Sequence, residues 1–298
     1  MADQMAHIVD ASYGTHNNVG RDQIINYDAF SRNIRCGQSP SSLSLNDAPI
    51  DHLSSHFTGR KEELDHIGKV FGMGHAITPT RYAIFGLPGM GKTQLALQYA
   101  KLSYHQRKYS VIFWISGATV EKLNQGLAKV LTLVDHPDRD HPDQSVRLIS
   151  ARRWLEEANA NGVSEWLLVL DNVSPEAISF LREHLPRQNS SGNILLTTRT
   201  AVVAQAVVAV AGQQHEVFEL RAPDIKDAAN QFLREAGINM SDPLPVCINK
   251  AESLAKCIGC LPLAISQAAS FAKQSDKKLD DVLALYQSKH KFEVRLNI

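Results

Sequence analysis

The stretch from Arg81 to Gln94 constrains the fold of this chain more than any other part of its sequence. A short apolar run, Tyr82 to Phe85, leads into a glycine-rich turn, and Lys92 and Thr93 then open a segment with helical spacing. Gly86 to Thr93 fits the pattern G-x-x-x-x-G-K-[ST] in full. In such a turn, successive backbone N–H groups wrap a phosphate chain, because glycine permits close approach and positive φ angles. The pattern therefore predicts a strand, a phosphate-binding loop and a helix.

Each residue type in this motif has a chemical role. We expect the Lys92 ammonium to reach the β- and γ-phosphates, and the Thr93 hydroxyl to bind Mg²⁺. The remaining predicted contacts to the ligand from this stretch are Gly86, Pro88, Gly89, Met90, Gly91 and Gln94. A chance glycine turn is the alternative, and the strand and helix patterns on both sides of the motif count against it.

Composition favours some classes of protein over others. The chain has 31 Lys and Arg against 31 Asp and Glu, so no net charge points to nucleic acid, a membrane surface or an acidic partner. Four cysteines without a disulfide framework, and no apolar run suited to a signal peptide, favour a reducing compartment. The longest apolar tract, residues 201–212, is too short to span a bilayer. We expect a cytoplasmic protein that binds neither nucleic acid nor a membrane.

Four further apolar runs predict strands. Ser110–Ile115 is the kind of continuous run that a strand buried on both faces produces, and Trp166–Asp171, Asn193–Thr197 and His215–Leu220 follow it along the chain. Helical stripes lie between these runs, and the pattern turns helical after the last one. The sequence therefore predicts an α/β fold that is followed in the chain by a helical segment.

Polar residues at the ends of the predicted strands are candidates for the site. After a phosphate loop, the Asp171 carboxylate is expected to hold Mg²⁺ opposite Thr93. Asn172 follows, and its amide cannot act as a carboxylate base, so no obvious group activates water. Arg199 is well placed to sense a γ-phosphate, with a structural arginine as the alternative. Arg60 opens a helical stripe, where it either contacts a nucleotide or is solvated.

Two cysteine- or histidine-containing segments suggest metal sites without completing them. Cys257 and Cys260 form a C-x-x-C, but no second pair exists for tetrahedral zinc, so apolar packing is the preferred interpretation. The loop Asp135–Asp143 has two prolines and alternating charge, which favour a solvated loop. Between Gly259 and Pro262 one helix is expected to end and another to begin.

Together and in this order, these segments resemble the NB-ARC domain of the STAND class of P-loop NTPases, nucleotide switches that include fungal NOD-like receptors. The resemblance runs from Phe57 to about Tyr286. It rests on Phe57–Leu64, Gly86–Thr93, Val111–Ile115, Leu168–Asn172, Leu196–Arg199 and Gly259–Ala264.

The resemblance implies a three-layer P-loop NTPase fold, with a five-stranded parallel sheet of order 5-1-4-3-2 and a small helical subdomain. It implies ADP at rest and ATP in the active form, with the adenine between Arg60 and Pro262. Lys92, Asp171 and Arg199 would be the catalytic residues, with Arg199 reading the γ-phosphate. Self-association in the ATP state is also implied, whereas effector and sensor partners are not identifiable.

The expected division of the chain is a polar, disordered leader over 1–55, a P-loop nucleotide-binding domain over 56–221, a helical ARC-like subdomain over 222–290 and a tail over 291–298. Within the leader, His16–Tyr27 has strand-like, self-pairing character, but a solvated segment is the preferred interpretation. No winged-helix segment or sensor repeat is visible, so we expect a truncated family member, a gene fragment or a stand-alone module.

Asn172 stands where the family usually has a second acid, so at most slow ATP hydrolysis is expected. The alternatives are a conventional P-loop ATPase or phosphotransferase, and an interaction fragment that binds no nucleotide.

Overall fold

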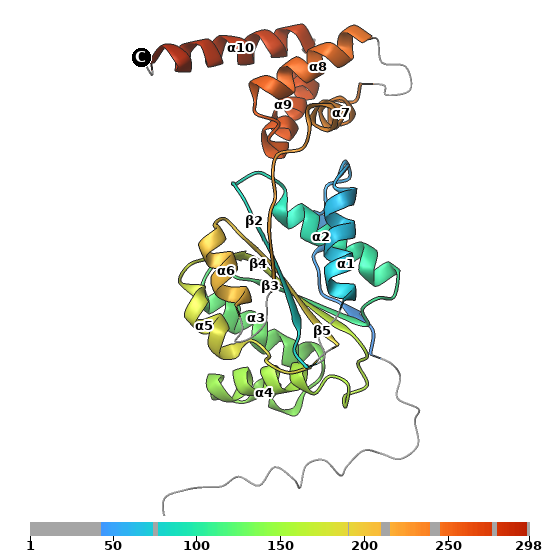
Figure 1. Ribbon diagram of the computed structural model, residues 1–298, viewed down its shortest axis with the longest axis vertical. Helices are drawn as coiled ribbons and strands as arrows, with labels where there is room; N and C mark the ends of the chain where they lie inside the picture. The colour runs from blue at the N-terminus through green and yellow to red at the C-terminus, as the bar shows by residue number, and fades with distance from the viewer. Residues whose placement is uncertain are drawn as a thin grey trace, which may run out of the picture. The chain divides into compact units, whose positions relative to one another are not determined.

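The computed structural model describes residues 43–73, 77–189, 191–209, 215–238, 245–275 and 279–296 (Figure 1). The segment His16–Tyr27, for which a solvated segment is preferred over a strand, lies outside the described residues. So does most of the predicted leader, together with the last two residues of the predicted tail.

One parallel sheet organises the larger part of the described chain. Its strand order is β1-β3-β4-β5-β2-β6. The strands are β1 (Leu45–Asn46), β2 (Thr80–Phe85), β3 (Val111–Ser116), β4 (Trp166–Val173), β5 (Gly192–Thr198) and β6 (Glu216–Glu219). From β6 to β3, the five strands predicted from the sequence stand in the expected order 5-1-4-3-2, so the predicted fold class is confirmed.

An edge strand from the segment assigned to the leader extends this sheet. Leu45 and Asn46 pair with Val111 and Ile112 of β3, and the short 3-10 turn η2 (Ile50–His52) follows. A strand of two residues has no periodicity, so no sequence pattern could indicate it. β1 is held in place by its pairing with β3 rather than by the strand propensity of its own two residues.

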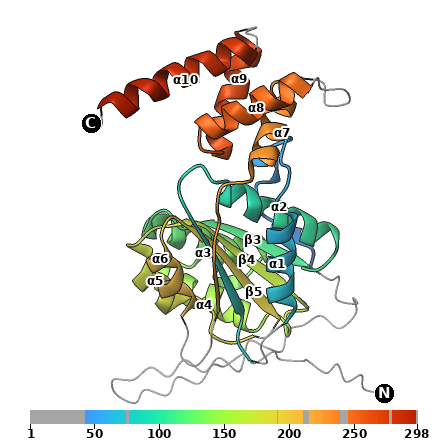
Figure 2. The same ribbon diagram turned by 45° about the horizontal axis from the view of Figure 1, so that its top comes forward.

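Helices cover both faces of the sheet (Figures 1 and 2). The first face carries α1 (Lys61–Gly72) and α2 (Lys92–His105). The second carries α3 (Val120–Leu133), α4 (Gln144–Glu156), α5 (Ala177–His184) and α6 (Ala201–Val208), with the 3-10 turn η3 (Pro137–Asp140) between α3 and α4.

The strand periodicity of two accounts for these two apolar layers. Val111 and Phe113 of β3 belong to the cluster on the α3–α6 side, whereas Ile112 between them belongs to the α1–α2 side. The strands β2 to β5 are therefore buried on both faces, as continuous apolar runs predict.

A separate helical core follows β6. It consists of α7 (Ile225–Glu235), α8 (Pro245–Cys257), α9 (Pro262–Gln274) and α10 (Leu279–Leu296). Phe232, Leu254, Ile265 and Val282 are fully buried within it. Pro262 occupies the first position of α9, where its missing N–H and restricted φ cost nothing. Among the described residues, every helix is either too short or too polar to serve as a membrane span.

Gly126 allows α3 to lie close against the sheet. A Cβ at this position would lie 2.3 Å from Cγ2 and 3.1 Å from Cβ of Ile115, so a rotamer change alone would not relieve the overlap. We expect Gly126→Ala to lower the free energy of unfolding by about 1–3 kcal/mol, as overpacking does. Urea denaturation followed by circular dichroism measures the change.

Gly68 provides the control for this substitution. It lies in α1, and a Cβ there would meet no atom within 4 Å. Gly68→Ala should leave the protein as stable as before, or more stable by about 0.5–1 kcal/mol, because alanine loses less backbone entropy in a helix. Equal stability of the two variants would contradict the close packing of α3.

Candidate functional site

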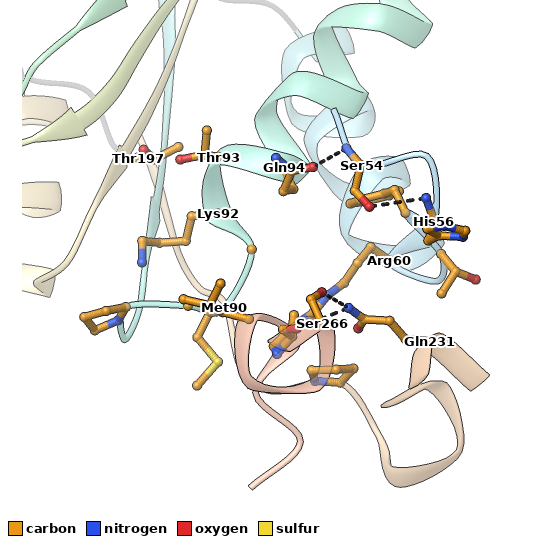
Figure 3. A pocket seen from close by; sticks show the side chains of 18 of the residues that line it. Ser54, His56, Arg60, Met90, Lys92, Thr93, Gln94, Thr197, Gln231 and Ser266 are labelled. Atoms are coloured by element: carbon orange, nitrogen blue, oxygen red, sulfur yellow. Dashed lines mark hydrogen bonds between the residues drawn. The ribbon is translucent and has the colours of Figure 1, made fainter. Parts of the chain in front are cut away.

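A cavity of about 620 Å³ lies where the carboxyl ends of β4 and β5 meet α2, α7 and α9. In open parallel α/β sheets, ligands bind beyond the carboxyl ends of the strands. Figure 3 shows Lys92, Thr93 and Thr197 toward one end of the cavity and Arg60, Gln231 and Ser266 toward the other. The predicted site residues that line it are Arg60, Pro88, Gly89, Met90, Gly91, Lys92, Thr93, Gln94, Asp171, Arg199 and Pro262.

Gly86 is the predicted residue that does not line the cavity. Its φ is +152°, and a Cβ there would lie 2.6 Å from the carbonyl oxygen of Leu220. Because Gly86 has no Cβ, the loop that follows β2 can pass close to the backbone of Leu220, which comes directly after β6. Its role in the structure is steric.

The phosphate-loop motif forms an open helix N-terminus. Gly91 is the N-cap of α2 with a φ of +88°, and no side chain caps this end of the helix. The first N–H groups of α2 are thus available to an anion, which the helix dipole also favours. This arrangement fits the phosphate group that the sequence motif predicts.

Two cations face this end of the cavity. The Lys92 ammonium donates hydrogen bonds of 2.8 Å to the carbonyl oxygens of Gly86 and Leu87. Burial and the positive charge of Arg199 lower the pKa of Lys92, and the Asp171 carboxylate opposes them. Arg199 has no carboxylate partner within the described part of the chain. An anion between the two cations would relieve their repulsion.

Oxygen ligands suited to Mg²⁺ lie next to these cations. Asp171 Oδ1 accepts hydrogen bonds from Thr93 Oγ1 at 2.8 Å and from Thr197 Oγ1 at 2.7 Å. No group of three or more His, Cys, Asp or Glu side chains suited to a metal ion occurs among the described residues. Mg²⁺ is usually held by one or two protein oxygens together with phosphate and water oxygens, so this sparse ligand set fits it.

Arg60 and Pro262 border the opposite part of the cavity. Arg60 has a left-handed φ of 61° at the start of α1. Its guanidinium donates to Glu63 Oε1 at 2.7 Å and to the carbonyl oxygen of Arg221 at 2.8 Å. The side chain is only 12% exposed, so it is a fixed part of the cavity wall.

Gln94 lines the cavity, but its amide group is already engaged. Its Oε1 accepts from the Ser54 N–H at 2.7 Å (Figure 3). Its Nε2 donates to the carbonyl oxygen of His52 at 3.0 Å. In this structure, Gln94 therefore fastens the segment after β1 to the first turn of α2.

Several lining residues were not predicted from the sequence as site residues. Thr197 bonds Asp171, and its place in the segment Leu196–Arg199 is the sequence signal that could have pointed to it. Gln231 Nε2 donates to Ser266 Oγ at 3.1 Å and to the carbonyl oxygen of Pro262 at 3.2 Å. The others not predicted are Ser54, His56, Phe57, Thr58, Asn172, Pro223, Asp227 and Leu263.

Hydrogen bonds join the helical part to the sheet part around the cavity. The N–H of Leu263 donates to the carbonyl oxygen of Gly89 at 3.2 Å, which ties α9 to the phosphate loop. Arg234 Nη1 of α7 donates to Thr58 Oγ1 at 2.9 Å. The cavity is therefore bounded by both parts of the chain.

A family comparison agrees with this geometry. The NB-ARC domain model matches residues 65–241, more than half of the chain. The chain belongs to the NB-ARC family. It is thus a member of a nucleotide-binding family of P-loop NTPases.

This NB-ARC chain is also similar to a longer fungal protein. A nucleotide-binding leucine-rich repeat (NLR)-like protein of Hyaloscypha variabilis is 28% identical to it over 289 residues. The match covers 87% of this chain and 27% of the relative, so the chain spans about a quarter of that protein's length.

Among solved structures, the ORC2 protein of Aeropyrum pernix, determined in ADPNP–ADP complexes, matches with a TM-score of 0.55. The match covers 81% of this chain and 72% of ORC2, at 15% identity. At that identity, the likeness concerns the fold alone.

The hydrogen bonds of Gln94 predict how the entering segment is held. We expect Gln94→Ala to speed hydrogen exchange at the Ser54 amide about fivefold, because a hydrogen bond contributes about 1 kcal/mol. Hydrogen exchange read by mass spectrometry on peptides covering residues 50–56 measures this. Gln98→Ala, one turn further along α2, is the control and should leave the exchange unchanged. Unchanged exchange in both variants would contradict the role of Gln94.

Proposed function

We propose that this NB-ARC chain binds ATP and ADP with Mg²⁺ and acts as a nucleotide switch with slow hydrolysis or none. The observation that carries the proposal is the cavity at the carboxyl edge of the sheet. It places two cations, an open helix N-terminus and the Thr93–Asp171 oxygen pair at one end. That combination suits the phosphates of a nucleotide and their metal ion.

Each residue at this end has a proposed role. Lys92 and the N-terminus of α2 bind the β-phosphate and its neighbour, while Thr93 and Asp171 hold Mg²⁺. The metal would neutralise phosphate charge when bound. Lys92 must exchange its bonds to the carbonyl groups of Gly86 and Leu87 for bonds to phosphate. Arg199 contacts the γ-phosphate, because it faces Lys92 and has no carboxylate partner among the described residues.

The adenine is proposed to lie between Arg60 and Pro262. Both residues line the cavity, and two hydrogen bonds keep the Arg60 guanidinium in place. A planar guanidinium can stack on an aromatic base, and the proline ring adds apolar surface opposite it.

Slow hydrolysis follows from the carboxylates available. In the described part of the chain, the carboxylates that line the cavity belong to Asp171 and Asp227. Asp171 is engaged by two hydroxyl groups, and Asp227 lies beside Gly59, where its Oδ2 is 3.0 Å from a Cβ added to that glycine. Asn172 occupies the position after Asp171, and an amide cannot take a proton from water. Among the described residues that line the cavity, no carboxylate is thus free to act as a general base beside the phosphates.

A switch also needs a part whose position depends on the ligand. The hydrogen bond from the Leu263 N–H to the carbonyl oxygen of Gly89 connects α9 to the phosphate loop. A change in the conformation of the loop can therefore alter the position of the helical part. We propose that ATP and ADP favour different arrangements of this connection and that the ATP state self-associates in cytoplasmic signalling of the defence or cell-death type. The NLR-like relative supports this proposal.

Lys92 tests nucleotide binding directly. Lys92→Ala should weaken ADP binding by at least about 100-fold in calorimetry, since charge-assisted hydrogen bonds contribute about 1.5–3 kcal/mol each and Lys92 would make more than one. Lys101→Ala, on the same helix but outside the cavity, is the control. Unchanged ADP affinity in Lys92→Ala would refute the proposed site.

Arg199 tests the discrimination between the two nucleotides. Arg199→Ala should weaken binding of a non-hydrolysable ATP analogue about 10-fold or more and leave ADP affinity within about twofold, because one charge-assisted contact to the γ-phosphate is lost. Calorimetry with both ligands measures the ratio. An equal loss of affinity for ADP and the analogue would contradict γ-phosphate sensing.

The rate of ATP hydrolysis distinguishes the proposed switch from a conventional ATPase. ATP turnover of the unaltered chain at about 10 per second or faster would favour a conventional ATPase.

A further inference from the structure

An irregularity in the sheet includes the proposed metal ligand, Asp171. Leu170 of β4 pairs with Leu196 of β5, and Val173 pairs with Thr198. Two residues of β4, Asp171 and Asn172, therefore face the single residue Thr197. Such a β-bulge leaves a backbone group without its ladder partner and changes the direction of a side chain, and it often occurs beside functional sites.

Thr197 replaces the missing ladder contact with its side chain. Its Oγ1 accepts a hydrogen bond from the Asn172 N–H at 2.8 Å and donates one to Asp171 Oδ1 at 2.7 Å. Asn172 is held with a left-handed φ of 57°. The Thr197 hydroxyl thus provides a partner for the Asn172 N–H of the bulge and also orients the Asp171 carboxylate.

Because Thr197 is buried, its hydroxyl forms its hydrogen bonds with other groups of the protein. Thr197 is 1% exposed although it borders the cavity, whereas Thr93 is half-buried and belongs to the phosphate loop. The branched Cβ of threonine also limits χ1, so the hydroxyl has little freedom to turn away. Of the two hydroxyls bonded to Asp171, Thr93 is the one suited to a metal and Thr197 the one suited to fixing the carboxylate.

We propose that Thr197 is a positioning residue that fixes the Asp171 carboxylate at the β4 bulge, and thereby sets how strongly Mg²⁺ strengthens nucleotide binding. This inference rests on the proposed binding of Mg²⁺-nucleotide. Groups that orient a metal ligand typically change metal affinity by about 10- to 100-fold. The valine side chain has nearly the shape of threonine but lacks the hydroxyl, so it would release the carboxylate and the Asn172 N–H together.

The neighbouring residue offers a matched control. Thr198 is also 1% exposed on β5, and its hydroxyl donates to the carbonyl oxygen of Val173 at 2.7 Å. Thr198→Val removes a buried hydroxyl that also bonds the backbone of β4, as a donor to a carbonyl oxygen, but leaves the bond from Thr197 to Asp171 in place. Any general effect of losing a buried hydroxyl should appear in both variants.

The experiment measures the affinity of the full chain for the ATP analogue AMP-PNP by calorimetry, once with Mg²⁺ and once with EDTA. The readout is the ratio of the two affinities. In Thr197→Val this ratio should fall about 10-fold or more relative to the unaltered chain, as for other groups that orient a metal ligand, while the affinity in EDTA stays within about twofold. Thr197→Ser, which keeps a hydroxyl, and Thr198→Val should retain most of the ratio.

The contrary outcomes are distinct. A normal ratio in Thr197→Val, or an equal loss of affinity with and without Mg²⁺, would overturn the positioning role while nucleotide binding by the unaltered chain stands. A serine variant that behaves like the valine variant would also overturn it. If the unaltered chain binds no nucleotide, or binds it without a Mg²⁺ effect, the proposed function itself fails. Thr197→Ala replaces Thr197→Val if circular dichroism shows that the valine variant does not fold.

Discussion

The parallel hydrogen-bond ladder is the constraint on which the rest of the structure depends. Because β2 to β5 are covered by helices on both faces, their interiors accept almost nothing but apolar side chains. Polar side chains can serve the site where the strands end, and parallel strands all end at the same edge. Asp171, Thr197 and Arg199 therefore come together from two neighbouring strands, beside the phosphate loop that follows β2.

The charge arrangement at this edge explains why the cavity suits an anion. Lys92 bonds to carbonyl groups of its own loop, and its pKa is lowered by burial and by Arg199. Neutral carbonyl groups compensate a buried ammonium less well than a phosphate does, since hydrogen bonds between ionised groups are stronger. The family's nucleotide-binding character agrees with this electrostatic imbalance. The helical part borders the cavity through α7 and α9, so residues from both parts of the chain line it.

Much of the fold could be predicted because its strands carry a strong signal. Continuous apolar runs such as Val111–Ile115 indicate burial on both faces, and the resemblance to NB-ARC domains supplied their order in the sheet. The edge strand at Leu45 was not predicted, since two residues form no pattern. Gln94 was predicted as a ligand contact; it lines the cavity, yet its amide bonds to the segment after β1. The roles of the site residues stay predictions for the binding experiments.

The sequence by itself determined the local chemistry. The glycines, lysine and threonine of Gly86–Thr93 are adjacent in the chain, so their spacing alone indicates a phosphate loop. Tertiary structure decided how the remaining parts of the site meet. Thr197 reaches Asp171 across 26 residues of chain, through a bulge that depends on the register of β4 against β5. The hydrogen bond from Leu263 to Gly89 likewise depends on how α9 packs. Register depends on the contacts between distant segments, because a slip of one residue would turn the apolar side chains of a strand to the wrong face. A short stretch of sequence read alone does not show which segment it will meet.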